Sequence, residues 1–427
     1  MKEECFWITS SPRTVFSENH VPRQVDVVVI GADTAGTTAA YELARAGSRV
    51  LLLDEHEVGS GMTAGSIGGL ISLAGASLAE CIRRGGFPRA RRFADAVFSA
   101  LESSRRLIEQ ERLVCALHES PTLLLGQTPL TAASVHEEYA AWRAVGTPVE
   151  WMESNDIRDA YPMLRALCAL SFSRGCTINP VAFVRGLAKR AEGMGVAVCE
   201  GVSVLAWSQE GEAITIKTSH GEVRTRHLFL CRAAENVSLY ETMIVTEPVE
   251  LLRGWSHGEV LANALPLPDC SRWLPDGRIL FTSGRTRGLS SSDQTLHESA
   301  LLLRRLFADW YDMRPPAIAA TWTRAVPPGH HIFPVLTRKS KNIVVASGGN
   351  VDQLALFVQA GISGAKMIQG APVPYEELFT SEKEKPLRVW AEGVFPPWVS
   401  RVAAQVRLDD ERADDAQARE PMHFSMR

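Results

Sequence analysis

The chain has 427 residues, of which 45 are Lys or Arg and 49 are Asp or Glu, giving a formal charge of −4 at pH 7. Domains usually hold roughly 100–200 residues, so this length predicts two or three packed units. The near-neutral charge argues against nucleic acid as a partner, and no segment approaches the ~20 unbroken apolar residues of a membrane span. The N-terminus also lacks the apolar core of a signal peptide. We therefore expect a soluble, cytoplasmic protein.

Eight cysteines are scattered along the chain, and no two of them stand at Cys-x-x-Cys spacing. This pattern gives no sign of a zinc site or a redox dithiol, so no metal site is predicted. Most of the cysteines have apolar neighbours, and we expect them to pack as small hydrophobic side chains.

The N-terminal part of the chain predicts one βαβ unit. Val25–Ile30 is a β-branched run of strand length, and residues 37–46 have helical character. Gly47 ends that helix, and Val50–Leu53 is a second apolar strand. Continuous apolar strands that flank a helix are typical of a parallel sheet covered on both faces.

Helices are predicted next. From about residue 76 to residue 146 the pattern is helical and amphipathic. Asn179 is a natural N-cap and Pro180 suits the first position of another helix, which ends at the glycines of 193–195. A strand follows at 196–198.

Short strands dominate the following region. Apolar or alternating runs, two of them joined by a hairpin turn at Ser219–Gly221, predict strands. These runs cover residues 213–218, 222–224, 228–230, 243–246, 278–281 and 317–323. One helix, at about 296–310, interrupts them, so the pattern favours an α+β layer over further βαβ units.

The C-terminal part returns to the parallel-sheet pattern. Residues 342–346 form an apolar strand that runs into Gly348 and Gly349, and a helix is predicted from about 354 to 368. After Ala371 the chain is Pro-rich and then charged, which is typical of a mobile tail.

The turn after the first strand carries a dinucleotide-binding pattern. Gly31 suits the tight turn, Gly36 lets helix and strand pack closely, and the start of the helix faces a pyrophosphate. Asp54 ends the second strand, where a carboxylate would accept the ribose hydroxyls. A glycine pattern alone is weak, and a βαβ unit without a dinucleotide is the alternative.

Together with 58–65, the stretch Val27–Leu53 resembles the FAD domain of the D-amino-acid oxidase/glycine oxidase (DAO) superfamily. Asn179-Pro180 opening a helix, the strand from Met243, residues 274–280 and the closing strand–Gly–helix are further matches. Their order is most similar to the gamma-glutamylputrescine oxidoreductase branch. The resemblance covers about residues 25–370.

The resemblance implies an α/β fold class: a Rossmann-like FAD-binding domain with a central parallel sheet, and an α+β substrate domain built on an antiparallel sheet. The FAD domain is expected to be discontinuous, and the chain to end in a tail. The expected segments are 24–75, 160–240 and 340–370 for the FAD domain, 76–159 and 241–339 for the substrate domain, and 371–427 for the tail.

The resemblance also implies FAD as cofactor and a small-molecule substrate, an amine or amino acid whose C–N bond is oxidised to an imine. The flavin would do the redox chemistry while the protein orients it. A homo-oligomer or a partner subunit is possible. The expected cofactor contacts are Gly31, Asp33, Thr34, Ala35, Gly36, Asp54, Glu55, Gly61, Thr63, Val204, Gly349, Asn350 and Val351.

Four residues are candidates for catalysis. His330 and His331 lie beside Phe333 and suit a general base, although a solvated pair in a Pro-rich loop is the plainer interpretation. Arg285 and Arg324 could each bind a substrate carboxylate with two hydrogen bonds, although surface arginines are commoner.

Three cofactor positions depart from the family pattern. Asp33 replaces the second glycine of the fingerprint, where two unit charges at ~4 Å and an effective dielectric of ~20 would repel by about 4 kcal/mol. Arg232 stands where a small residue is usual, and the loop 348–353 has lost most of its glycines. An ion pair between Asp33 and Arg232, within roughly 4 Å, would offset the first two changes.

These departures keep two alternatives open. One is a flavin-free, degenerate family member that serves as a binding or partner subunit, and the other is an enzyme that uses a different dinucleotide. A visible absorbance spectrum distinguishes a flavoprotein from a flavin-free relative.

Overall fold

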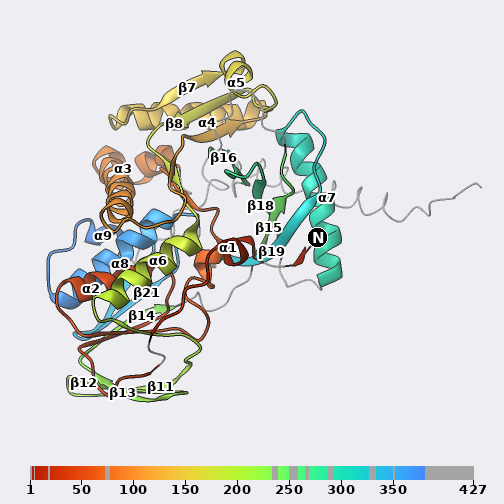
Figure 1. Ribbon diagram of the computed structural model, residues 1–427. Helices are drawn as coiled ribbons and strands as arrows, with labels where there is room; N and C mark the ends of the chain where they lie inside the picture. Colours follow the sequence, from red (N-terminus) through yellow and green to blue (C-terminus); the bar gives the residue numbers. More distant parts are fainter. Residues whose placement is uncertain are drawn as a thin grey trace, which may run out of the picture.

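The computed structural model describes residues 2–3, 5–17, 20–72, 77–232, 239–249, 258–264, 269–286, 292–326, 333–349 and 352–379. Two large sheets organise this part of the chain, and they lie in different regions of the molecule (Figure 1). The expected tail, 371–427, lies outside the described residues from position 380 onward.

The first large sheet has six strands in the order β10-β3-β2-β14-β21-β20, all parallel except β20. Its central strand β14 pairs with β2 on one side and with β21 on the other, so the N-terminal and C-terminal segments share one sheet, as expected. The strands are β2 (Val27–Ile30), β3 (Val50–Leu53), β10 (Ala197–Cys199), β14 (His227–Arg232), β20 (Val335–Ser340) and β21 (Ile343–Ser347).

Both faces of this sheet are covered, which explains its continuous apolar strands. Val27 and Val29 pack in the main core with the helices α2 (Thr34–Arg45), α6 (Pro180–Gly193) and α8 (Leu354–Gln369). Val28 points the other way, into a core shared with a three-stranded antiparallel sheet. That sheet consists of β11 (Val204–Glu210), β12 (Ala213–Thr218) and β13 (Gly221–Thr225).

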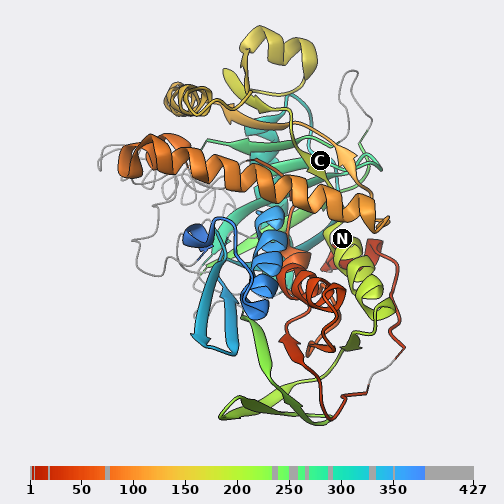
Figure 2. The same ribbon diagram turned by 90° about the vertical axis from the view of Figure 1, so that its left-hand side faces the viewer.

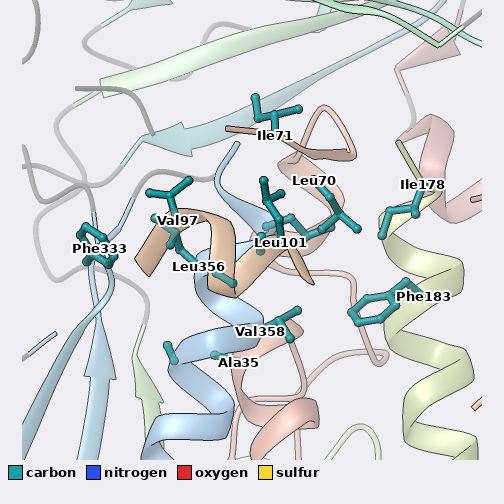
Figure 3. Close-up of a cluster of buried hydrophobic side chains, with 14 of the residues drawn as sticks. Ala35, Leu70, Ile71, Val97, Leu101, Ile178, Phe183, Phe333, Leu356 and Val358 are labelled. Atoms are coloured by element: carbon teal, nitrogen blue, oxygen red, sulfur yellow. The ribbon is translucent and has the colours of Figure 1, made fainter. Parts of the chain in front are cut away.

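The main core lies where α2, α3 (Leu78–Gln110), α6 and α8 meet. Figure 3 shows side chains that these helices contribute to the core, among them Ala35 of α2, Leu101 of α3, Phe183 of α6 and Val358 of α8. Alanine and glycine at these contacts let the helices approach closely. The same core extends to the second large sheet through Met243 and Val260.

The second large sheet has nine strands in the order β1-β19-β15-β18-β17-β16-β6-β8-β7 and is antiparallel except at the β1–β19 and β16–β6 pairs. The strands are β1 (Lys2–Glu3), β6 (Thr122–Gly126), β7 (Glu150–Glu153), β8 (Cys168–Phe172), β15 (Leu239–Thr246), β16 (Val260–Asn263), β17 (Cys270–Trp273), β18 (Ile279–Thr286) and β19 (Ile318–Val326). On one of its faces α5 (Ser154–Ala160) and α7 (Ser292–Trp310) bury a second core rich in aromatic side chains.

The region 76–146, expected to be helical throughout, holds two helices with strands between them. The helix α3 lies across the molecule in Figure 2 and contacts α8 and α4 (Pro129–Ala144). The segment Thr122–Gly126 is a strand because it pairs on both edges, with β8 and β16. The short elements are α1 (Phe6–Ser10), η1 (Met62–Gly65), β4 (Gly69–Leu70), β5 (His118–Glu119), β9 (Cys176–Thr177) and α9 (Glu376–Phe379).

Two strands lie on the other side of the expected domain boundaries. The strand β8 lies in the nine-stranded sheet, where it pairs with β6 and β7, although residues 160–240 are expected in the FAD domain. The strand β20 falls in the six-stranded sheet, as the antiparallel partner of β21. Among the described residues, no helix is long and apolar enough to cross a membrane.

Candidate functional site

A cavity of about 140 Å³ opens where β2, β14 and β21 end. The carboxyl ends of parallel strands meet at one edge of a sheet, which is where α/β proteins bind ligands. The cavity is lined by Gly31, Asp33, Thr34, Ala35, Gly61, Met62, Thr63, Cys231, Pro334, Ala346, Ser347, Gly348, Leu354 and Phe357. Six of the residues expected from the sequence to contact a cofactor are therefore together at this edge.

The two fingerprint glycines do what the sequence predicted of them structurally. Gly31 has a φ of +99°, which is the left-handed conformation that favours glycine. A Cβ on Gly36 would lie 1.9 Å from the carbonyl oxygen of Gly31, so no larger residue lets α2 start so close to β2. The turn and the start of the helix thus form the floor of the cavity.

Asp54 directly follows β3 and binds the backbone of the turn after Gly31. Its Oδ2 accepts a hydrogen bond of 2.6 Å from the Ala32 N–H, and its Oδ1 accepts one of 2.8 Å from the His56 N–H. Burial raises the pKa of this carboxyl group. Asp54 is not among the residues that line the cavity.

Asp33 precedes α2, but its carboxylate does not cap the helix. Instead it accepts hydrogen bonds from two consecutive backbone N–H groups of η1, at 2.8 Å from Met62 and 3.2 Å from Thr63. Burial, and secondly the nearby charge of Asp54, raise the pKa of Asp33. A carboxylate thus lies inside the crevice in which the sequence predicts a pyrophosphate.

Arg324 projects from β19 and joins three other parts of the chain. Its Nε donates to Glu241 of β15 at 2.7 Å, its Nη1 donates to the Gly65 carbonyl at 2.6 Å, and its Nη1 and Nη2 each bind Asp352 at 2.7 Å. Nη2 also donates to Glu241. All five N–H groups of a guanidinium are accounted for within the chain. This geometry opposes the expectation that Arg324 binds a substrate carboxylate, because no N–H remains for one.

Three other predicted cofactor contacts, Glu55, Val204 and Gly349, are not among the residues that line the cavity. Glu55 is exposed and forms a 3.7 Å contact with the His56 ring. Val204 opens β11 and pairs with Thr218. Gly349 is buried with a φ of +91°, and a Cβ there would lie 2.9 Å from the Phe357 ring.

Several predicted residues cannot be placed. His330, His331, Asn350 and Val351 lie outside the described residues. The same is true of the side chains of Arg285 and Arg232, so the expected ion pair between Asp33 and Arg232 stays a prediction.

Met62, Cys231, Pro334, Leu354 and Phe357 are among the cavity residues that sequence reasoning missed. A signal existed for Cys231, because it follows an apolar strand whose end had to reach the same edge as Gly31. The backbone N–H of Met62 binds Asp33, and no side-chain pattern reveals such a backbone contact. Pro334 and Phe357 come from segments that are far from Gly31 in the sequence.

Comparison with known proteins finds the following similarities. A family model described as FAD dependent oxidoreductase matches residues 26–361. Glycine oxidase of Bacillus licheniformis is 24% identical over 376 residues, which are 85% of this chain and 98% of that protein. Gamma-glutamylputrescine oxidoreductase of Escherichia coli (strain K12) is 22% identical over 314 residues, which are 70% of this chain and 72% of that one.

Another relative, a Bacillus subtilis (strain 168) protein whose name describes a Rieske 2Fe-2S iron–sulfur protein, is 23% identical over 53% of this chain. The match spans 44% of that relative's length. Among solved structures, glycine oxidase from Geobacillus kaustophilus superposes with a TM-score of 0.70 at 17% identity, covering 85% of this chain and 100% of that one. At this identity the superposition shows a shared fold.

Proposed function

Because the chain belongs to the FAD-dependent oxidoreductase family, whose cofactor is FAD, we propose that this enzyme oxidises a C–N bond of a small amine or amino acid to an imine. The observation that carries the proposal is the match to glycine oxidase along almost the whole of that protein. The relative whose name includes gamma-glutamylputrescine supports amines as an equal choice of substrate.

The turn at Gly31 and the Asp54 carboxylate suit the pyrophosphate and the ribose of FAD. The turn at Gly31 and the start of α2 would hold the pyrophosphate, since a helix N-terminus favours negative charge. A carboxylate has about four lone-pair sites, so Asp54 can accept ribose hydroxyls besides its two backbone partners. When bound, FAD supplies the oxidant, which accepts the two electrons and the hydrogen that leave the carbon beside the amine nitrogen.

The chain's own residues near the cavity position the two halves of the site. Arg324 fixes β19 of the nine-stranded sheet to η1 and to Asp352, which precedes α8. Trp322 of the same strand donates from Nε1 to the Ala64 carbonyl at 3.2 Å. We keep His330 and His331 as the proposed bases and Arg285 as the proposed contact of a substrate carboxylate.

A second candidate function is favoured by one observation. The Asp33 carboxylate lies among the groups that line the cavity, at the place where the family's pyrophosphate would lie. This feature suits a flavin-free relative that acts as a binding or partner subunit.

One experiment separates the two functions. Protein purified in the presence of added FAD is freed of unbound cofactor, scanned in the visible range and then mixed without oxygen with glycine, L-proline or gamma-glutamylputrescine. The oxidoreductase is expected to show the two flavin bands and to lose them with at least one of these compounds. Lactate, which has a carboxylate but no C–N bond, is the control and should leave the bands unchanged. A colourless protein, or bands that no amine bleaches, would contradict the proposal.

A further inference from the structure

Asp33 makes an unusual choice of hydrogen-bond partners. An aspartate at the residue before a helix normally accepts a hydrogen bond from an N–H of the first helical turn. Here the carboxylate turns away from α2 and binds the Met62 and Thr63 N–H groups of η1 instead. Backbone N–H groups that follow one another in a turn form an anion-binding site. In this protein the anion at that site is a side chain of the same chain.

The surrounding residues are fitted to this carboxylate. A Cβ on Gly61 would lie 2.4 Å from the Oδ2 of Asp33, so glycine is needed for η1 to approach the carboxylate. The Thr63 hydroxyl accepts the Thr34 N–H at 3.1 Å and lies 2.9 Å from the Thr34 hydroxyl. The helix start and η1 are therefore joined side by side along one wall of the cavity.

Two anion-binding features thus meet at one place. One is the N-terminus of α2, which Asp33 leaves without a side-chain cap, and the other is the pair of N–H groups on η1. A pyrophosphate carries two adjacent anionic groups, which matches two adjacent sites. The turn at Gly31 lets a ligand come close to both.

We propose that the Asp33 carboxylate is an internal substitute for one phosphate group, so that a dinucleotide has to displace it from the Met62 and Thr63 N–H groups in order to bind. Asp33 then sets the affinity of the crevice for the diphosphate portion of a ligand and has no effect on the adenosine portion. The inference rests on the family's cofactor crevice and is independent of the reaction that we propose.

The charges around Asp33 agree with this role. Asp54, which follows β3, adds a second negative charge nearby. The Cys231 thiol of β14, whose pKa is raised by burial and by these two carboxylates, adds no positive charge. A phosphate that entered beside an ionised Asp33 would meet like charge on two sides. Movement or protonation of Asp33 relieves this repulsion.

The test compares ADP with adenosine, by titration calorimetry, on the wild-type protein and on Asp33→Gly. The two ligands differ only in the diphosphate. We expect Asp33→Gly to bind ADP at least about tenfold more tightly, because the substitution removes a like charge beside the diphosphate and leaves the Met62 and Thr63 N–H groups to it. Adenosine affinity should be unchanged. FAD, followed by the quenching of its fluorescence, should respond as ADP does.

Two further variants make the outcome decisive. Asp33→Asn removes the charge at nearly constant shape and should also gain ADP affinity, which keeps the test open if the glycine variant does not fold. Asp26→Asn is the matched control: it removes a charge at the other end of β2, in an ion pair with Arg49, and should not change ADP binding. Equal ADP affinities in the wild-type protein and both Asp33 variants, or an equal gain for adenosine, would overturn the proposal. Neither result depends on whether an amine is oxidised.

Discussion

Arg324 is held by two carboxylates from separate elements, Glu241 on β15 and Asp352 before α8, and all three side chains are buried. The guanidinium also binds the carbonyl of Gly65. A buried charge network of this kind depends on every member, because removal of one leaves a charge uncompensated in a poorly solvated place. Without Arg324, the carboxylates of Glu241 and Asp352 would face each other with no guanidinium between them.

Replacement of Arg324 by Met should therefore reduce the free energy of unfolding by about 3–5 kcal/mol. Urea denaturation with linear extrapolation measures this loss. The control is Arg45→Met, which removes an exposed pair with Glu42 of the same helix and should cost no more than about 1 kcal/mol. Similar losses in the two variants would mean that the Arg324 network contributes no more than a surface ion pair.

At the residue scale, the sequence predicts which residues lie near the crevice better than it predicts their hydrogen-bond partners. Gly31 and Gly36 lie where the fingerprint implies, since the turn and the helix start follow from local sequence. Thr63, which the family resemblance implied, lines the same cavity. The partners of Asp33 and Arg324 come from η1 and from the segment before α8. Those contacts depend on long-range packing, which no local pattern encodes.

Among the elements, α8 and α2 pack with little space between them. A Cβ on Gly361 of α8 would lie 2.5 Å from the carbonyl oxygen of Ala35 and 2.6 Å from the Cβ of Thr38. A Cβ on Gly364 would lie 2.2 Å from the Phe229 ring of β14. The two glycines let the helix contact α2 and the sheet at the same time.

The same substitution should consequently have opposite effects at two helical glycines. Gly361→Ala should reduce the free energy of unfolding by about 1–3 kcal/mol, since a backbone carbonyl blocks the added methyl group. Gly193→Ala, at the end of α6, meets no atom within 4 Å and should be neutral or stabilising by up to about 1 kcal/mol. Thermal denaturation of the two variants measures both changes in stability. Equal stability of both variants would show that α8 moves away from α2 at little cost.

Elements buried on both faces were the easiest to predict. The apolar runs at β2, β3, β14 and β21 identify strands without knowledge of their neighbours. In contrast, β6 lies in a region with a helical pattern, and the sequence pattern predicts no strand at β16 or β17. These strands exist because distant segments pair with them, as β6 pairs with β8 and β16. Tertiary pairing overrides local propensity at such places.

The whole molecule shares one main core between its two large sheets. Val29 and Val344 of the six-stranded sheet belong to the same buried cluster as Met243, Val245 and Val260 of the nine-stranded sheet. The N-terminal segment adds to this link, since β1 pairs with β19 and the Trp7 indole donates to the Ser66 carbonyl at 2.8 Å. Unfolding of one sheet would expose apolar surface of the other.

We therefore expect a single cooperative transition when the protein is heated in a calorimeter without added ligand, despite its length. Two resolved heat-absorption peaks would show that the sheets unfold independently and would contradict a shared core. Trp7→Ala is a useful companion variant. The loss of a buried Trp should reduce the free energy of unfolding by about 3–5 kcal/mol, and the protein should still unfold in a single transition.

The order of strands in the six-stranded sheet has a consequence for the synthesis of the protein. β2, α2 and β3 leave the ribosome early, whereas β21 and α8, which complete the sheet and cover α2, follow about 300 residues later. At roughly 5–20 residues per second the nascent chain waits on the order of 15–60 s before its cofactor crevice can close. Throughout that interval α2 lacks the helix that will bury its alanines, so the nascent chain presents an apolar surface until α8 has been made.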